Sequence, residues 1–202
     1  MTDMWQIEAG LFDQGIQLIC GVDEAGRGPL AGPVCAAAVI LPPNLDIPGL
    51  NDSKKLSDKK RRELFPLIKE QAIAYGIAFA DHNEIDAINI LQATYLAMER
   101  AISQLQVKPE YALVDGNRAK DFGLPVKTVV QGDSLSASIA AASILAKVTR
   151  DDYMEQIAKT YPNYKFEVHK GYGTKAHYEA LDKFGPCAIH RMSFLKKCYG
   201  NQ

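Results

Sequence analysis

The sequence predicts an α/β protein built on a mixed five-stranded sheet that is flanked by helices. Two observations lead to this prediction: strand-like apolar runs come early in the chain, and a helix–strand–strand–helix alternation follows them. Size and composition agree, because 202 residues with 47% hydrophobic and 23% charged side chains suit a soluble globular protein with a sizeable core.

Five runs rich in Ile, Val and Ala, bounded by Gly, Pro or charged residues, are expected to be strands. They are Ile16–Asp23, Pro33–Leu41, Ala72–Ala80, Tyr111–Asp115 and Val126–Val130. A short glycine-rich turn separates the first two, which predicts a hairpin.

Four segments with helical spacing of apolar residues are expected to be helices. They are Ser57 to about Gln71, Asn83–Leu105, Leu135 to about Lys159, and Thr174–Phe184. Ser57 and Thr174 are the predicted N-caps, and Pro66 should kink the first helix. Gly185-Pro186 should end the last one.

The net charge is −1, but the charges are unevenly distributed. From Lys147 to Gln202 there are ten Lys or Arg and six Asp or Glu, whereas the remainder of the chain is acidic. A basic tail beside an acidic, cation-holding body can bind a polyanion. Ordinary solvated surface charge is the alternative explanation.

The sequence predicts a cytoplasmic protein. No basic region precedes an apolar segment at the N-terminus, so no signal peptide is predicted. The longest wholly apolar run, Val34–Leu41, is too short to span a bilayer. Cys20 and Cys35 lie in apolar runs, where buried free thiols are expected.

Four acids lie at the ends of three predicted strands, where α/β folds build sites. Asp23 and Glu24 end the first, Asp115 ends the fourth, and Asp133 lies three residues beyond the fifth. Because neighbouring strand residues point to opposite faces, Asp23 and Glu24 can share a site only where the strand ends or bends. For Asp115 and Asp133 taken singly, a turn and a helix cap are the simpler interpretations.

Carboxylates without nearby His favour hard cations, so Mg²⁺ or Mn²⁺ is predicted rather than zinc. Two such ions about 4 Å apart can clamp the attacking water and the leaving oxygen of an in-line displacement. Arg27, which lies between two glycines, can approach an anion closely. Together these features indicate chemistry on a phosphate.

Asp23-Glu24-Ala25-Gly26-Arg27-Gly28 resembles the signature of ribonuclease HII, the bacterial type 2 ribonuclease H. Further blocks agree in order: Asn51–Ser57, Asp115-Gly116-Asn117, Gly132-Asp133-Ser134, Ala141–Asp151, His169–Thr174 and Gly185–Phe194. The resemblance runs from about Ile16 to Phe194. It implies a ribonuclease H-like fold over residues 1–161, with a small C-terminal helical appendage over 162–202 that binds substrate.

The resemblance also implies an activity. The expected enzyme hydrolyses the RNA strand of RNA–DNA hybrids and cuts 5′ of single ribonucleotides embedded in duplex DNA, using two metal ions and leaving 3′-hydroxyl and 5′-phosphate ends. Asp23 would bridge the ions, and Glu24, Asp115 and Asp133 would complete the ligand shells.

Substrate contacts follow from the same resemblance. Gly26, Arg27 and Gly28 would recognise the ribose 2′-hydroxyl, and Tyr172 would stack at the junction between ribonucleotide and deoxyribonucleotide. Residues proposed to contact phosphates are Lys54, Lys55, Lys170 and Arg191. A glycine-rich turn and a half-buried packing role for Tyr172 are the alternatives.

Two other side-chain groups are interpreted as structural. His169 and His190 are expected to make hydrogen bonds within the protein. Ser143 and Lys147 form an i,i+4 pair in an apolar helix, where packing is the expected role.

Other functions fit the same residues less well. A two-metal nuclease of the same fold that cuts DNA, such as a resolvase-like enzyme, would not need the Gly26–Gly28 element. A non-catalytic hybrid-binding module should have lost an acid. Residues 1–15 match no block, and the tail from Lys197 to Gln202 shows no sliding-clamp peptide. A monomer is expected.

Overall fold

In a computed structural model, which describes residues 4–199 (side chains of 197–199 excepted), five strands form one sheet in the order β3-β2-β1-β4-β5. The strands are β1 Ile19–Ala25, β2 Val34–Ile40, β3 Ala74–Ala80, β4 Tyr111–Asp115 and β5 Val126–Val129. The pairs β1–β2 and β2–β3 are antiparallel, whereas β1–β4 and β4–β5 are parallel. This confirms the predicted mixed sheet and the hairpin.

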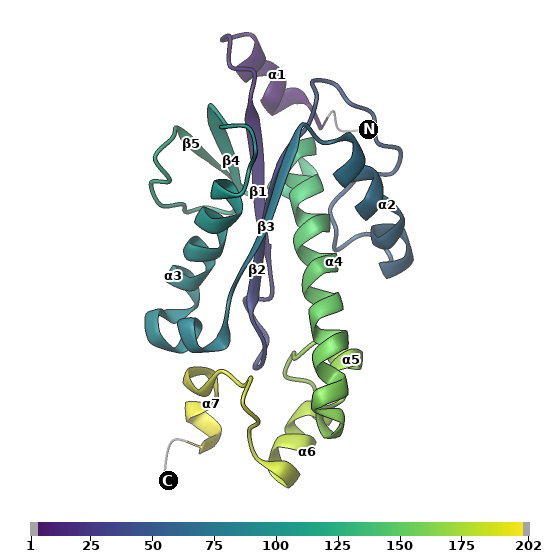
Figure 1. The fold of residues 1–202 in the computed structure, drawn as a ribbon, viewed down its shortest axis with the longest axis vertical. Coiled ribbons are helices and arrows are strands. Elements are labelled where there is room, and N and C mark those ends of the chain that lie inside the picture. The colour runs from purple at the N-terminus through teal and green to yellow at the C-terminus, as the bar shows by residue number, and fades with distance from the viewer. Residues whose placement is uncertain (1–3, 200–202) are drawn as a thin grey trace.

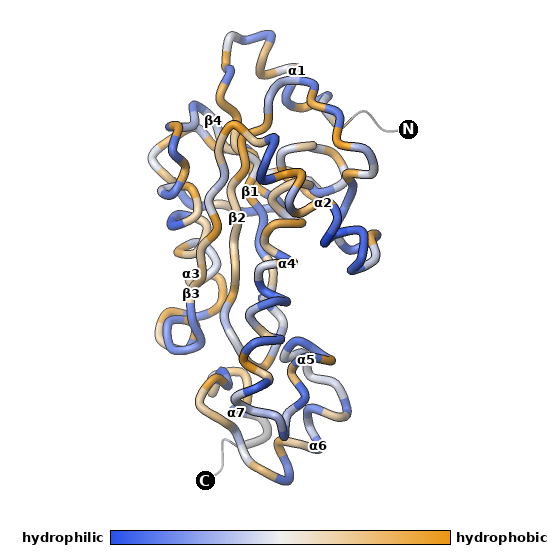
Figure 2. Tube along the Cα trace, turned by 45° about the vertical axis from the view of Figure 1, so that its right-hand side comes forward, coloured by the Kyte–Doolittle hydropathy of each residue, from blue (hydrophilic) through white to orange (hydrophobic). Residues whose placement is uncertain are grey.

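Helices cover both faces of the sheet (Figure 1). The described helices are α1 Gln6–Phe12, α2 Asp58–Gln71, α3 His82–Ser103, α4 Ala137–Thr160, α5 Phe166–His169, α6 Lys175–Phe184 and α7 Met192–Tyr199, with 3₁₀ turns η1 Gly132–Ser134 and η2 Pro162–Tyr164. Helix α3 packs on one face and α2 with α4 on the other, each over its own hydrophobic cluster. In Figure 2 the central strands are largely hydrophobic, whereas α2 contains hydrophilic segments.

The predicted helix caps are confirmed. Ser57 and Thr174 accept hydrogen bonds from the N–H groups of Lys60 and His177, and Gly185 ends α6. Helix α2 runs through Pro66 as one element. The break falls in α3 instead, at Asn89 (φ 67°, ψ 164°), whose side chain caps the restarted helix.

Helix α1 was not predicted, because seven residues carry too little periodic signal. It is held by Glu8, whose fully buried carboxylate accepts hydrogen bonds from Ser136 Oγ at 2.6 Å and from the Ser138 N–H at 3.1 Å. Burial raises the pKa of Glu8. Glu8 therefore fixes the N-terminus of α4 from outside the sheet.

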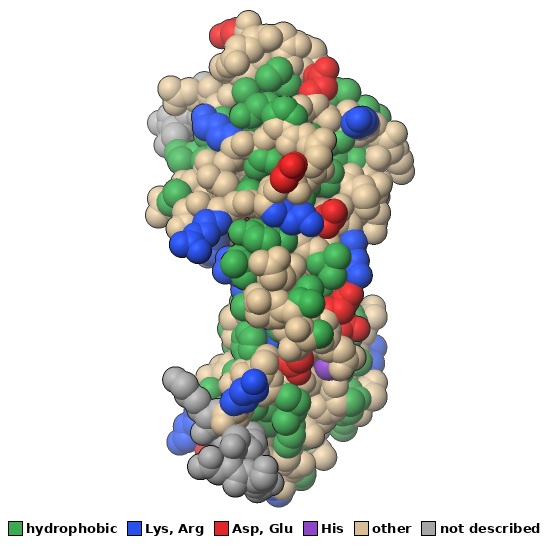
Figure 3. Space-filling view, turned by 90° about the vertical axis from the view of Figure 1, so that its left-hand side faces the viewer, with side chains coloured by type: hydrophobic (Ala, Val, Ile, Leu, Met, Phe, Trp, Pro, Cys, Tyr) green, Lys and Arg blue, Asp and Glu red, His purple; other side chains and the backbone are tan. Residues whose placement is uncertain are grey.

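The chain after Tyr161 forms the narrow end of the molecule, which lies at the bottom of Figures 1 and 3. Its hydrophobic cluster also includes Leu30 and Ala31 from the β1–β2 loop and Met154 from α4. An isolated antiparallel bridge joins Ala31 to His190. Because this cluster uses residues from both sides of the predicted boundary at 161, that boundary stays a prediction.

Candidate active site

Asp23 lies on a strand that continues beyond it. Strand β1 pairs with β2 through Glu24 and Ala25, so the predicted end at Asp23 is wrong by two residues. The alternation of the strand therefore separates Asp23 from Glu24. Asp23 is buried on the α4 side, where Ser143 of that helix lines the same pocket.

Asp115 reaches Asp23 because β4 runs parallel to β1 and ends beside it. Val114 is paired with Val22, which places the next residue of each strand, Asp115 and Asp23, side by side. The Asp115 carboxylate accepts a hydrogen bond from the Gly132 N–H at 2.7 Å. A Cβ at Gly132 would lie 2.6 Å from the Ile139 side chain, so this close docking of η1 requires glycine.

Asp133 enters from η1, at the start of the chain segment that leads into α4. Its side chain is only 4% exposed and accepts a hydrogen bond from Lys54 Nζ at 2.9 Å. Burial raises the pKa of Asp133, and the Lys54 ammonium opposes this shift.

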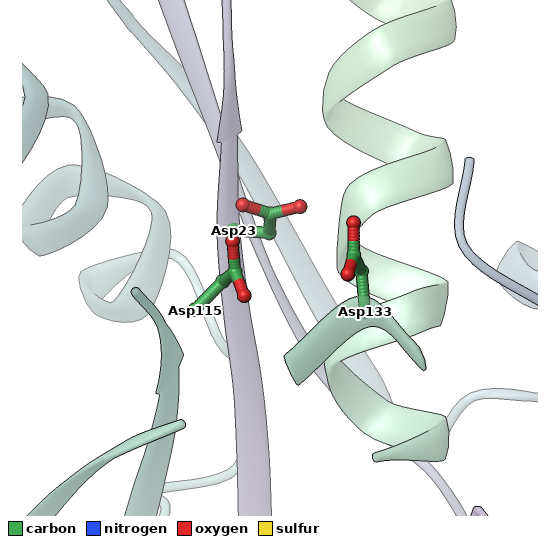
Figure 4. A group of neighbouring side chains, drawn as sticks. All are labelled: Asp23, Asp115 and Asp133. Carbon is green, nitrogen blue, oxygen red and sulfur yellow. The ribbon is translucent and has the colours of Figure 1, made fainter. Parts of the chain in front are cut away.

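The three aspartates converge as the sequence predicts (Figure 4). Among the described residues, Asp23, Asp115 and Asp133 form a cluster whose carboxylate oxygens lie within 4.8 Å of one another. The pKa of Asp23 is raised well above its usual value by burial and then by repulsion from Glu24 and Asp115. Such crowded oxygen ligands fit a divalent cation, which would offset the repulsion.

Glu24 is outside this cluster, although it adjoins it. Its carboxylate pairs with Arg27 at 3.2 Å, and burial raises its pKa against the effect of that arginine. Glu24 and Asp115 also line a second pocket of about 260 Å³ on the α3 side, together with Tyr95 and Arg118. Asp115 thus lies near both carboxylates, that of Asp23 on the α4 face of the sheet and that of Glu24 on the α3 face.

Two contacts bring α4 close enough to serve the site. Helix α4 packs directly on the backbone of β1 at Gly21, where a Cβ would lie 2.1 Å from the Ser138 carbonyl carbon. The Ser143 hydroxyl then lies 2.6 Å from that of Ser53, which belongs to the loop that carries Lys54. Ser143 is buried in α4, in agreement with the predicted packing role, and its hydroxyl also bonds Ser53.

The glycine-rich loop and Tyr172 face each other across the same pocket. A Cβ at Gly28 would lie 3.5 Å from Tyr172 Cε1. The pocket, of about 240 Å³, is lined by Asp23, Glu24, Ala25, Gly26, Arg27, Gly28, Ser53, Lys54, Arg61, Asp115, Ser143, Lys147 and Tyr172. Tyr172 is 44% exposed, so its ring is accessible from solvent.

The predicted phosphate contacts divide into two groups. Lys54 and Lys55 are 75% and 63% exposed at the site, where they bond Asp133 and Ser134. Lys170 is largely buried and paired with Glu155 at 2.8 Å.

Arg191 requires a correction. It is fully buried, and its guanidinium donates to the backbone carbonyls of Gly26, Arg27 and Gly32. Because every guanidinium nitrogen is used inside the protein, a phosphate contact at the surface is wrong. The residues that neighbour Arg191 in the sequence do not indicate that its side chain bonds carbonyl groups near the start of the chain.

Sequence comparison agrees with the geometry. The model of the ribonuclease HII family matches residues 20–197. The chain belongs to the ribonuclease HII family. It is 55% identical to ribonuclease HII from Caldicellulosiruptor bescii over 95% of this chain and 93% of that protein. The ribonuclease HII family comprises nucleases, so the chain is a hydrolytic enzyme.

Solved structures of ribonuclease HII relatives share the fold. The ribonuclease H2 from Pyrococcus horikoshii is 25% identical, with a TM-score of 0.73 over 91% of this chain and 99% of that one. The ribonuclease HII of Archaeoglobus fulgidus, solved in a complex with PCNA, is 26% identical, with a TM-score of 0.69 over 87% and 94%. The predicted ribonuclease H-like fold is thereby confirmed.

Three further predictions concern membrane helices, the C-terminal tail and the cysteines. Among the described helices, none has both the length and the hydropathy to cross a membrane. The expected absence of a sliding-clamp peptide concerns residues 197–202, whose side chains lie outside the described part. Cys20 and Cys35 are buried free thiols, as predicted.

Proposed function

We propose that this chain hydrolyses the RNA strand of RNA–DNA hybrids and cuts on the 5′ side of a single ribonucleotide within duplex DNA. The products would carry 3′-hydroxyl and 5′-phosphate ends. One observation carries the proposal: Asp23 and Asp115 of the three-aspartate cluster line a single pocket with the Gly26–Gly28 loop and Tyr172. A phosphodiester placed at the acids therefore has its ribose next to the loop.

Asp23, Asp115 and Asp133, with Glu24 beside them, would hold two divalent ions, Mg²⁺ or Mn²⁺. When bound, such ions supply an activated water and neutralise charge that develops on the phosphate. The protein holds the ligands in place without them: the N–H groups of Gly132 and Glu24 bond Asp115 and Asp23, and Lys54 bonds Asp133.

The loop backbone would distinguish RNA from DNA by its 2′-hydroxyl. Arg191 already uses the carbonyls of Gly26 and Arg27. Within residues 4–199, no backbone partner takes the N–H groups of Arg27 and Gly28, which leaves them for substrate. Residues 162–202 would serve as a substrate-binding segment because they carry Tyr172.

A cleavage assay with three duplexes tests the proposal. The three duplexes share one base sequence. The first is a long RNA–DNA hybrid, the second is a DNA duplex with one ribonucleotide, and the third is DNA alone. We expect cleavage of the first two and none of the third. Cleavage of the all-DNA duplex at a comparable rate would place the enzyme in the rival class of DNA-cutting nucleases.

Tyr172→Ala provides the more specific arm of that assay. Stacking of a base on an aromatic ring contributes roughly 1–3 kcal/mol to binding, which this variant would lose. A single-ribonucleotide substrate has only one register in which to bind, so it cannot compensate for the loss. The variant should lose more activity on that duplex than on the long hybrid. Equal losses on both would make Tyr172 a structural residue.

A further inference from the structure

Three buried histidines lie beneath Tyr172. His169, His177 and His190 are 8%, 0% and 2% exposed. His177 stacks on His169 at 4.6 Å between ring centroids and packs edge-on against Phe166 at 5.5 Å. No other part of the proposed reaction uses these rings.

Backbone donors determine where the protons lie on these rings. The Cys187 N–H donates to His190 Nδ1 at 2.9 Å, closer than the Cys187 carbonyl and thiol at 3.2 Å, so we assign this nitrogen as an acceptor. A neutral His190 then carries its proton on Nε2, which lies 3.0 Å from His177 Nε2. His177 accepts that bond and must carry its own proton on Nδ1, which lies 2.9 Å from the Tyr172 carbonyl oxygen.

The result is a hydrogen-bond relay with one direction: Cys187 N–H to His190, His190 to His177, and His177 to the carbonyl of Tyr172. Every ring nitrogen of His177 and His190 is used. His169 follows the same rule separately, since it accepts from the Gly171 N–H at 3.2 Å and bonds the Tyr164 carbonyl at 2.8 Å.

The end of the relay lies directly behind the ring that lines the pocket. The Tyr172 carbonyl receives the His177 proton and the Thr174 N–H, while the Tyr172 N–H donates to the His169 carbonyl. The neighbour of His190 in the chain, Arg191, fixes the carbonyls of Gly26 and Arg27 on the facing loop. The His190-Arg191 pair thus anchors both walls of the ribonucleotide-reading part of the pocket.

We propose that His177 is a positioning residue that holds Tyr172 at the distance from Gly28 required to select a single ribonucleotide junction. His177 contacts no substrate and acts through the Tyr172 backbone alone. This proposal rests on the proposed function, because it assigns a source to the selectivity that Tyr172 supplies.

Two substitutions at His177 separate its two bonds. In His177→Asn the side-chain amide replaces Nδ1, so the donor to Tyr172 is kept and the acceptor for His190 is lost. In His177→Gln the amide replaces Nε2, so the bond to His190 is kept and the donor to Tyr172 is lost. Tyr164→Phe is the matched control, since it removes another buried bond of the same region, from Tyr164 to the Gly185 carbonyl at 2.6 Å.

The readout is the ratio of cleavage rates on the single-ribonucleotide duplex and on the long hybrid. His177→Gln should lower this ratio by about tenfold, whereas His177→Asn and Tyr164→Phe should keep it within about twofold. In a Tyr172→Ala background, neither His177 variant should change the ratio further. A merely structural role would lower both rates together, and would do so in either background.

Several outcomes would overturn the proposal: an unchanged ratio in His177→Gln, equal effects of Asn and Gln, or an effect that persists without the Tyr172 ring. A wild-type enzyme that fails to cut the single-ribonucleotide duplex would instead overturn the proposed function, and this inference with it. Imidazole ¹⁵N chemical shifts of the wild-type protein provide a test that needs no variant. They should show the proton of His177 on Nδ1 and that of His190 on Nε2, and the opposite tautomers would refute the relay.

Discussion

The guanidinium of Arg191 donates a hydrogen bond to the carbonyl of Gly26 at 2.6 Å, across 165 residues of sequence. It also donates to Arg27 and Gly32, so a single side chain holds much of the glycine-rich loop. Burial, and then repulsion from Arg150, lower the pKa of Arg191 to about 9. The guanidinium is kept there because planar, divergent donors match several carbonyls at once.

Arg191→Met should lower the free energy of unfolding by about 3 kcal/mol or more, because it leaves the buried carbonyls of Gly26 and Gly32, and the part-buried carbonyl of Arg27, without this donor. Urea denaturation near neutral pH measures the change. Lys175→Ala is the control, since the Lys175 side chain is 92% exposed and forms a long ion pair with Glu179 at 3.8 Å. Its effect should stay within about 0.5 kcal/mol, and an equally small effect of Arg191→Met would contradict the assigned role.

Asp23→Asn should abolish cleavage while the fold is kept. The substitution removes a carboxyl group whose pKa is raised by burial and by repulsion from Glu24 and Asp115. The metal-free variant should therefore be more stable than the wild type by ~0.5–2 kcal/mol. Cleavage assays and thermal melts of the same preparation measure both effects. Near wild-type activity would remove Asp23 from the site.

Cleavage should require Mg²⁺ or Mn²⁺ and stop in excess chelator. Ca²⁺ should support substrate binding with little cleavage, because it takes more ligands at longer distances than Mg²⁺. Binding by fluorescence anisotropy and cleavage by gel, in each metal, would show the separation. Robust cleavage in chelator would rule out the two-metal proposal.

Stability should fall in acid because of the buried histidines. Burial lowers the pKa values of His169, His177 and His190, the last to about 4. Between about pH 6.5 and about pH 4 the unfolded chain binds more protons than the folded one, so the free energy of unfolding drops as pH falls.

The contribution of one histidine reaches at most ~1.4 kcal/mol per pH unit. His190→Gln should therefore reduce the slope of stability against pH in this window. Urea denaturation at several pH values measures the slope in both proteins, and identical slopes would show that His190 does not contribute.

Local sequence patterns predicted much of the fold and the acids of the site. The strand runs and the caps at Ser57 and Thr174 depend on neighbouring residues, so periodicity and capping chemistry suffice. The convergence of Asp23, Asp115 and Asp133 also follows, because parallel strands end at one edge of a sheet. These features need no knowledge of distant contacts.

What sequence missed depends on contacts between distant segments. Helix α1 is fixed by Glu8 through Ser136, 128 residues away, and nothing in its seven residues shows this. Arg191 looked like a phosphate ligand because a short segment does not show whether its arginine is buried. The separation of Asp23 from Glu24 was likewise decided by β2, whose pairing carries β1 past both acids.

The order in which the chain is made gives the Arg191–Gly26 contact a consequence for biosynthesis. The loop at residues 26–33 and all three clustered aspartates are synthesised before residue 134, yet the side chains that fix the loop are Arg150 and Arg191. A nascent chain therefore contains all three clustered acids before it contains the side chains that fix the loop proposed to recognise ribose. The loop would be fixed only when residue 191 has left the ribosome and docked against residues 26–32.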